Sequence, residues 1–231
     1  MKKIIKKIMI ISLILSIALP LYAQEEEEYT LKGIKIKKFP FYIYHDGFHR
    51  LNHYCPSGWM GDWGDIKLNE RWMKNPKSGK SCIQIKYTAE RKQGAGWAGI
   101  YWQNPPNNWG TSKGGYDLRG AKKLFFYARG EKGGELVEFK CGGITGQYSD
   151  SAAATSGPIE LTKKWKLYEI DLADMDLSYI SGGFCVVFSG QMNPDGCTFY
   201  VDEVYYTDKD KPMKIKKATK KSKKRRKRRK K

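Results

Sequence analysis

Residues 124–140 read LFFYARGEKGGELVEFK. Its two ends, residues 124–129 and 136–140, are rich in the aromatic and branched apolar residues that favour β-strands. The glycine-rich residues 130–134 between them are typical of a turn. The sequence therefore predicts a strand, a turn and a returning strand here.

The same pattern extends to both sides of this stretch. Ile83, Ile85 and Tyr87 alternate with polar residues, which is the period of a half-buried strand. Further β-rich runs lie downstream, at residues 165–172, 184–188 and 199–206. A turn at residues 193–196 joins the last two. No stretch keeps a capped helical period for three turns. We therefore predict an all-β fold, a two-sheet jelly-roll β-sandwich.

The charge is unevenly distributed along the chain. The 231 residues hold 43 Lys and Arg against 24 Asp and Glu, for a formal net charge of +19. Residues 24–208 hold 23 basic and 23 acidic residues, whereas residues 209–231 hold 16 basic residues and one acid. A neutral body excludes a globally basic nucleic-acid-binding domain. An aromatic content of 13% excludes disorder of the body, which is long enough to bury a core.

The two ends have their own composition. Residues 1–23, MKKIIKKIMIISLILSIALPLYA, have the layout of a secretory signal peptide. The alternative is an uncleaved membrane anchor, for which the apolar run is short. We expect export to the periplasm, the cell surface or the extracellular space. Residues 24–38 form a leader that we expect to be partly disordered, residues 39–208 the sandwich, and residues 209–231 a disordered polybasic tail.

The body contains five cysteines, at Cys55, Cys82, Cys141, Cys185 and Cys197. Export permits disulfides, but an odd count leaves at least one thiol unpaired within the chain. We expect most of them to be small buried side chains in strands. If two do pair, Cys185 and Cys197 are the expected pair, because they flank one hairpin-length connection.

Five segments carry a resemblance to a known fold: residues 78–85 (SGKSCIQI), 97–102 (WAGIYW), 116–130 (YDLRGAKKLFFYARG), 165–172 (WKLYEIDL) and 199–204 (FYVDEV). They resemble strands of the carbohydrate-binding-module type of jelly roll, the galactose-binding-domain-like fold. The resemblance covers about residues 40–207. It implies the fold and points to poly- or oligosaccharide ligands, although this fold also serves as a non-binding accessory domain.

The closing run, residues 199–206, contains an acid among aromatic residues. We expect Phe199, Val201 and Tyr205 to share one face and Asp202 to lie on the other. An unpaired carboxylate there is costly, and a hard cation with oxygen ligands would offset the cost. The resemblance implies a structural Ca²⁺ held by Asp202, by a carboxylate near the first strand, for which Asp46 is the best candidate, and by carbonyls near residues 78–81. The alternative is a solvated Asp202, or one that pairs with a lysine.

Sugar recognition uses flat aromatic rings stacked on pyranose faces, with planar polar groups that bond the hydroxyls. The candidate ligand-binding residues are Trp97, Tyr101, Gln103, Trp109, Tyr127, Arg129 and Glu138. They would occupy one face on each of three strands, with Trp109 at the rim in a loop rich in Pro and Asn. If the three faces coincide, they form one platform. The alternative for each aromatic residue is ordinary core packing.

Two other groups of residues could in principle bind a metal or catalyse hydrolysis. Three histidines four residues apart precede a cysteine: His45, His49, His53 and Cys55. On a helix they could hold zinc, but Gly47 interrupts them and a β-rich run precedes them, so ordinary loop or core histidines are expected. Paired acids such as Asp62 and Asp65 could suggest a glycoside hydrolase. No catalytic motif surrounds them, and we expect no enzymatic activity.

The sequence thus predicts an exported, non-catalytic module that binds poly- or oligosaccharide. Its tail would bind anionic envelope polymers or lipid head groups. A solubilising tail without a partner is the alternative, and no aromatic residue in the basic run supports specific nucleic-acid binding. A second hypothesis is a structural or assembly protein of the cell envelope whose sandwich binds protein. A small hydrolase is the third.

Overall fold

The computed structural model describes residues 29–31, 34–36 and 38–215. The predicted signal peptide, residues 1–23, and the distal part of the polybasic tail, residues 216–231, lie outside the described residues. The described residues fall into two units, one ending at Lys38 and the other beginning at Phe39. In the first, strands β1 (Tyr29–Leu31) and β2 (Ile34–Ile36) pair antiparallel within the leader.

The second unit is an all-β sandwich, so the predicted fold class is confirmed. Its strands are β3 (Phe41–Tyr44), β4 (Cys55–Gly61), β5 (Ile66–Trp72), β6 (Cys82–Tyr87), β7 (Trp97–Gln103), β8 (Lys123–Gly130), β9 (Leu136–Gly142), β10 (Ala153–Glu160), β11 (Lys166–Asp171), β12 (Gly182–Ser189) and β13 (Cys197–Thr207). A 3-10 turn, η1 (Trp63–Asp65), precedes β5. None of the described residues forms a helix long and apolar enough to cross a membrane.

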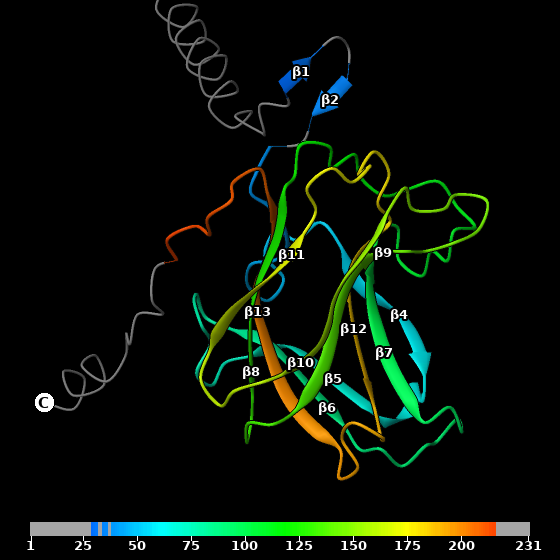
Figure 1. The fold of residues 1–231 in the computed structure, drawn as a ribbon, viewed down its shortest axis with the longest axis vertical. Coiled ribbons are helices and arrows are strands. Elements are labelled where there is room, and N and C mark those ends of the chain that lie inside the picture. The colour runs from blue at the N-terminus through cyan, green and yellow to red at the C-terminus, as the bar shows by residue number, and fades with distance from the viewer. Residues whose placement is uncertain (1–28, 32–33, 37, 216–231) are drawn as a thin grey trace, which may run out of the picture. The chain divides into compact units, whose positions relative to one another are not determined.

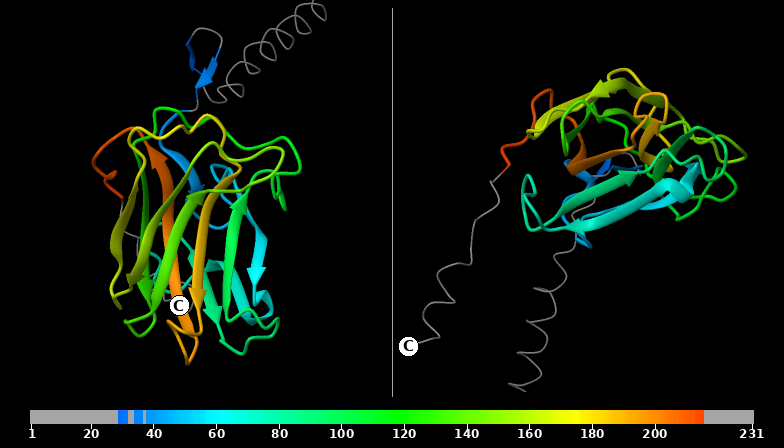
Figure 2. Two further views of the ribbon diagram at one scale, coloured as in Figure 1. Left: turned by 45° about the vertical axis from the view of Figure 1, so that its right-hand side comes forward. Right: turned by 90° about the horizontal axis from the view of Figure 1, so that it is seen from below.

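The strands form two antiparallel sheets (Figure 1). The five-stranded sheet has the order β10-β9-β12-β7-β4. The six-stranded sheet has the order β11-β8-β13-β6-β5, with β3 added beside β13. Figure 2 shows the strands of both sheets running lengthwise through this unit. Each sheet therefore has an inner face toward the core and an outer face toward solvent.

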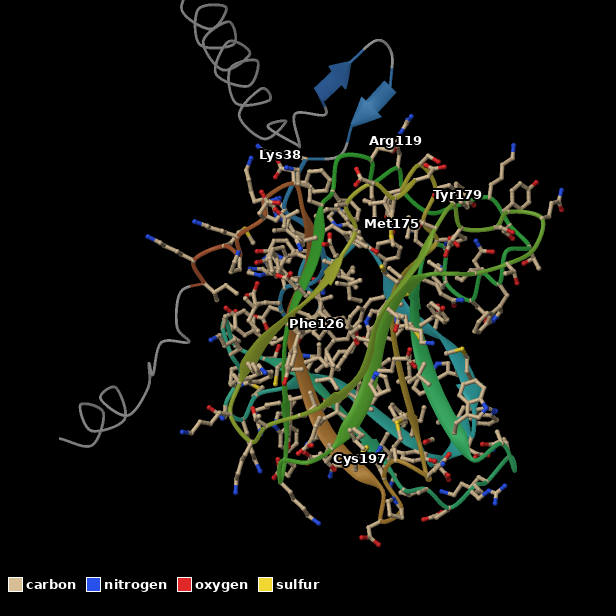
Figure 3. The ribbon with its side chains drawn as sticks, viewed as in Figure 1. Lys38, Arg119, Phe126, Met175, Tyr179 and Cys197 are labelled. Atoms are coloured by element: carbon tan, nitrogen blue, oxygen red, sulfur yellow. The ribbon has the colours of Figure 1, made fainter. Side chains whose placement is uncertain are left out.

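Aromatic rings fill the space between the sheets. Phe126 of β8 packs against Phe139 of β9, with ring centroids 4.5 Å apart. Phe184 of β12 contacts both rings, at 5.5 and 5.9 Å. Phe126 lies in the middle of the sandwich (Figure 3). These contacts join the two sheets, so the inward residues of each strand are committed to the core and the outward residues are free to serve a site.

The turn at residues 130–134 does not close a hairpin. β8 lies in the six-stranded sheet, whereas β9 lies in the other sheet and pairs with β12 and β10. The prediction of two strands here is correct, but the prediction that the second returns beside the first is wrong. The connection from β12 to β13 through residues 193–196 also changes sheets. Such crossings are how a jelly roll builds two layers.

A β-bulge changes the faces of the closing strand. The register of β13 against β8 shifts between Asp202 and Tyr205, and Glu203 has a φ of 50°. Phe199 and Val201 point into the core, but Tyr205 lies on the outer side with Asp202. The expectation that Tyr205 shares the face of Phe199 is wrong, because the extra residue of a bulge inverts the alternation beyond it.

The five cysteines are all free thiols. Four are buried, as expected for small apolar side chains, and Cys55 is half-buried. The conditional pair does not form, since Cys185 and Cys197 lie in different sheets. Burial raises the pKa of the Cys141 thiol to about 12, which keeps it protonated and unreactive at neutral pH.

Candidate functional site

The candidate site is the outer face of the five-stranded sheet. In β7, Ala98, Ile100 and Trp102 point into the core. Because side chains alternate along a strand, Trp97 and Tyr101 point outward. Both remain accessible, with Trp97 exposed to 39% and Tyr101 half-buried. The predicted common face of these two aromatic residues is therefore present.

The strand register shows which residues lie beside them. One row across the outer face runs through Thr155, Lys140, Cys185, Tyr101 and Gly58. The next row runs through Pro158, Glu138, Val187, Gly99 and Met60. Glu138 and its neighbour Lys140 thus share a face with Tyr101, as predicted for Glu138. Gly58, next to Tyr101 in the first row, and Gly99 in the second row add no side chains to this face.

Trp109 joins this face from the loop that follows β7. Its ring meets the ring of Tyr101 edge to face, with centroids 6.0 Å apart. Its indole nitrogen donates to Oδ1 of Asn107 at 3.2 Å, and 38% of the residue is exposed. Edge-to-face packing is a favourable aromatic geometry and orients both rings. Trp109 therefore stands at the rim of the face, where the sequence places it.

Two hollows adjoin the aromatic residues. The first, of about 300 Å³, lies beside Tyr101 and is lined by Lys140, Gly143 and Thr155 among others. The Tyr101 hydroxyl donates to the carbonyl of Gly142 at 3.0 Å, and burial raises its pKa, so it stays protonated. The second hollow, of about 550 Å³, adjoins Trp97 and is lined by residues that include Arg91, Ser189, Gln191 and Pro194.

Polar side chains occupy the far end of the face. Glu138 accepts a hydrogen bond from Oγ1 of Thr155 at 2.7 Å and pairs with Lys140 at 3.1 Å. A half-exposed pair of this kind contributes little to stability. Its carboxylate and ammonium groups are available to exchange partners with hydroxyl groups of a ligand.

Gln103 is on the same strand but does not face a ligand. It is fully buried, and its Nε2 donates to the carbonyl of Asn108 at 2.9 Å. Its Oε1 accepts from Oγ of Ser57 at 2.8 Å. The amide therefore holds the loop that carries Trp109 against β4. Gln103 positions the rim and is not placed for direct contact with a ligand.

Tyr127 and Arg129 do not belong to this face. Both lie on β8, on the outer side of the six-stranded sheet. The Lys77 ammonium lies 4.2 Å from the Tyr127 ring centre, and the Arg129 guanidinium lies 3.7 Å from that of Tyr200. The condition for one common platform is therefore not met for Tyr127 and Arg129, because the chain changes sheets between β7 and β8.

Asp46 and Asp202 hold the same loop from two sides. Asp46 accepts hydrogen bonds from the backbone N–H groups of Gly47, Lys80 and Ser81 at 2.9 to 3.0 Å. Burial raises the pKa of Asp46, but these bonds, with one from the Ser81 hydroxyl, outweigh it and hold the pKa below its usual value.

Asp202 makes the second set of contacts. Its Oδ2 accepts from the N–H groups of Lys77 and Ser78 at 2.8 and 3.2 Å, and its Oδ1 accepts from Glu203. Burial raises the pKa of Asp202 well above its usual value. Calcium takes oxygen ligands, whereas these carboxylates are occupied by N–H donors and, as they stand, do not fit the ion. The calcium site expected from the sequence is untested by these contacts, which lead us to expect a fold that is stable without the ion.

The three histidines have separate partners. Nδ1 of His45 lies 3.2 Å from a carboxylate oxygen of Glu203, the ring of His49 packs edge-on against His45, and the ring of His53 stacks on Phe41. Within the described part of the chain, no group of three metal-ligating side chains gathers. The three histidines therefore make contacts with neighbouring side chains in the loop between β3 and β4.

Sequence reasoning missed two strands that complete the face. β4 contains Pro56 and Gly58, and the β10 run AATSGPIE contains Gly157 and Pro158, so neither has a β-rich composition. Thr155 was missed with β10. Alternating burial along β10 is visible in the structure, but its polar composition hides the signal in the sequence.

Comparison with known proteins finds no matching protein-family model and no matching curated protein. Among solved structures, a family 30 carbohydrate-binding module is similar with a TM-score of 0.54 and 16% identity, over 78% of this chain and 93% of that one. The family 30 carbohydrate-binding module of cellulosomal cellulase Cel9D-Cel44B of Clostridium thermocellum is similar with a TM-score of 0.50 and 18% identity, over 75% of this chain and all of that one. At these identities the likeness establishes the fold, and the chain has the β-sandwich jelly roll of carbohydrate-binding modules.

Proposed function

We propose that this protein is a non-catalytic module that binds poly- or oligosaccharide on the outer face of its five-stranded sheet. The observation that carries the proposal is the gathering of Trp97, Tyr101 and Trp109 on one accessible face. Exposed aromatic rings stack on the apolar faces of sugars, and the pair of Glu138 and Lys140 supplies polar groups for hydroxyls.

The spacing of the rings favours a chain over a single sugar. Trp97 and Tyr101 are four residues apart on β7, which corresponds to about 13 Å along a strand. A ligand that contacts both rings must extend along the strand direction. The hollows beside Tyr101 and Trp97 lie along the same line.

The paired acids support a binding role without catalysis. Asp62 accepts N–H bonds from Gln93, Ala95 and Gly96 at 2.6 to 2.9 Å. Asp65 is buried and accepts from the N–H of Arg91 at 2.7 Å. Carboxylates engaged with backbone donors in a loop are poorly placed to act as an acid and base pair.

Export and a role for the tail complete the proposal. The signal-peptide layout of residues 1–23 supports export, and the 16 basic residues of the tail support binding to an anionic surface. In this arrangement the sandwich binds glycan while the tail holds the protein to envelope polymers or lipid head groups.

The test is a glycan array with the full chain, followed by calorimetry on the best ligand. We expect Trp97→Ala, Tyr101→Ala and Trp109→Ala each to weaken binding about tenfold or more, since each removes a stacking ring. Tyr127→Ala is the matched control, because it removes a ring from the other sheet, and it should leave the affinity unchanged.

Other outcomes would point elsewhere. A blank array with a pull-down rich in envelope proteins would favour the structural or assembly protein. Release of reducing sugar from a bound polysaccharide would support the hypothesis that the protein is a small hydrolase. Equal losses in the β7 variants and in Tyr127→Ala would contradict the assignment of the site to the five-stranded sheet.

A further inference from the structure

Two large apolar side chains stand out from the surface of the six-stranded sheet. Phe48, in the turn after β3, is 78% exposed, and Met73, directly after β5, is 71% exposed. Among the large apolar side chains of the described residues, these are the two most exposed. Single exposed apolar residues are normal, whereas exposed apolar residues that gather at one edge of a sheet point to a partner.

Arg71 shows that the two lie at one edge. Its guanidinium carbon is 5.2 Å from the centre of the Phe48 ring, and a Cβ placed on Gly47 would come within 2.7 Å of its Cγ. Met73 follows Arg71 by two residues at the end of β5. The turn after β3 and the end of β5 therefore present Phe48 and Met73 together.

Hydrogen bonds fix the turn that contains Phe48 and keep its side chain in solvent. Asp46 ties Gly47 to the neighbouring loop through the N–H groups of Lys80 and Ser81. Phe48 itself has a φ of 55°, a backbone region that bulky residues disfavour. The fold thus keeps a large ring in solvent on a strained and anchored turn, which packing within the sandwich does not explain.

Exposed basic side chains lie on the same segments as this apolar pair. They are Arg50, Arg71, Lys74 and Lys80. Of the acids on these segments and beside them, Asp46 accepts N–H bonds, Glu203 bonds His45 and Ser78, and Glu70 is half-buried with a pKa that burial raises. We call Phe48, Met73 and these four basic residues the basic-apolar edge.

The described end of the chain leaves the sandwich near this edge. The N–H of Met213 donates to the Tyr205 hydroxyl at 3.1 Å, and the Tyr205 ring lies 5.5 Å from that of Tyr42. Tyr42 in turn packs against His45 at 4.6 Å, and His45 against His49 at 4.8 Å, one residue from Phe48.

The chain beyond the described residues is strongly basic. Residues 216–231 contain 13 Lys and Arg and no acid. The polybasic tail and the basic-apolar edge therefore begin on the same part of the molecule. The positive charge of the basic-apolar edge would repel a second copy of the same edge and would also repel the tail. An anionic partner would instead be attracted to both the edge and the tail.

We propose that the basic-apolar edge docks on an anionic lipid bilayer, with Phe48 and Met73 inserted among the lipid chains and the basic residues at the head groups. Apolar insertion beside basic residues is how peripheral proteins bind such surfaces, and one weak anchor is not enough for stable attachment. The tail attracts the protein to the anionic surface over a long range, and the basic-apolar edge inserts its two apolar side chains into the bilayer. The proposal does not depend on sugar binding, which uses the other sheet.

The test is flotation of the exported form, residues 24–231, with phosphatidylcholine vesicles that contain either no or about one-third phosphatidylglycerol, at about 0.1 M and 0.5 M NaCl. High salt screens the charges of the tail but leaves apolar insertion intact. We expect the native chain to stay bound to the anionic vesicles at high salt. Phe48→Ser combined with Met73→Ser should bind at low salt and lose at least about tenfold at high salt.

Trp63→Ser is the matched control. Trp63 is 54% exposed in η1, at the opposite end of β5 from Met73, so its removal should not affect binding at either salt concentration. Circular dichroism and thermal unfolding confirm that each variant is folded.

Three results would overturn the proposal. Equal binding of the native chain and the double variant at high salt would show that the edge does not insert. Complete release of the native chain at high salt would assign membrane binding to the tail alone. A native dimer in light scattering that the double variant abolishes would make the edge an interface between copies.

Discussion

At the residue scale, three carboxylates of this protein hold backbone loops in place. Asp46, Asp62 and Asp202 each accept at least two N–H bonds from loop residues that are far away in the chain. A carboxylate that accepts several N–H bonds is stabilised in its charged form unless burial outweighs the bonds, as it does for Asp202. These aspartates thus anchor loops through N–H bonds, whereas the sequence led us to expect that Asp46 and Asp202 bind a cation.

The pair of His45 and Glu203 predicts a pH dependence of stability. The hydrogen bond to Glu203 raises the pKa of His45 above its usual value of 6.5. Such a group stabilises the fold fully below its unfolded pKa and loses that contribution as the pH rises through the folded pKa. The Tm difference between the native chain and His45→Gln should therefore be largest near pH 5.5 and shrink above about pH 6.5. A difference that grows with pH would contradict this assignment.

The contacts of Asp46 and Asp202 predict the response to calcium. N–H donors already occupy both carboxylates, and an ion would have to displace them. We expect the Tm in EDTA and in millimolar CaCl₂ to agree. A Tm that rises with calcium and no longer does so in Asp202→Asn would show that the loop rearranges to bind the ion.

At the element scale, glycines of β4 allow this strand to lie close against β7, which contains Trp97 and Tyr101. Gly58 pairs with Tyr101 across the sheet, and an added Cβ on Gly58 would lie 2.8 Å from the Cβ of Tyr101. Gly61, at the end of β4, has a φ of 59° and lies so close to β7 that an added Cβ would be 2.2 Å from the Trp97 carbonyl oxygen. The element that presents Trp97 thus depends on a close backbone approach that only glycine allows.

Gly61→Ala should lower the free energy of unfolding by more than about 2 kcal/mol, because it combines a left-handed backbone with a collision. Gly94→Ala separates the two effects. Gly94 has a φ of 84° and nothing within 4 Å of an added Cβ, so only the backbone penalty applies, about 1 kcal/mol. Urea denaturation of the two variants checks the difference, and equal losses would show that β4 relaxes away from β7.

At the scale of the whole molecule, the two outer faces of the sandwich have different chemistry. The five-stranded sheet presents rings and a balanced Glu138–Lys140 pair, and the six-stranded sheet presents the basic-apolar edge. Because stacking is insensitive to ionic strength, glycan affinity should change less than about twofold between 0.05 and 0.5 M NaCl. Calorimetry at both salt concentrations checks this, and a steep loss would place the glycan on the basic side.

Local sequence patterns predict much of the fold and some of the residues of the candidate site. The alternation in WAGIYWQ places Trp97 and Tyr101 on one face of a strand whatever the sheet around it. The Pro- and Asn-rich loop places Trp109 at a rim. Tyr127 and Arg129 have the same local signature, but their sheet depends on whether the chain crosses the sandwich before β8, and no property of residues 123–130 encodes that crossing.

Most of the strands, many of their inward residues and the charge segregation of the ends can be predicted from the sequence, because these depend on periodicity and composition over a few residues. The three-dimensional structure is needed to see which strands share a sheet, how the bulge at Glu203 turns Tyr205 outward, and that Gln103 is buried under a loop. These outcomes depend on contacts between residues far apart in the chain, and such contacts form only when two layers pack around one core.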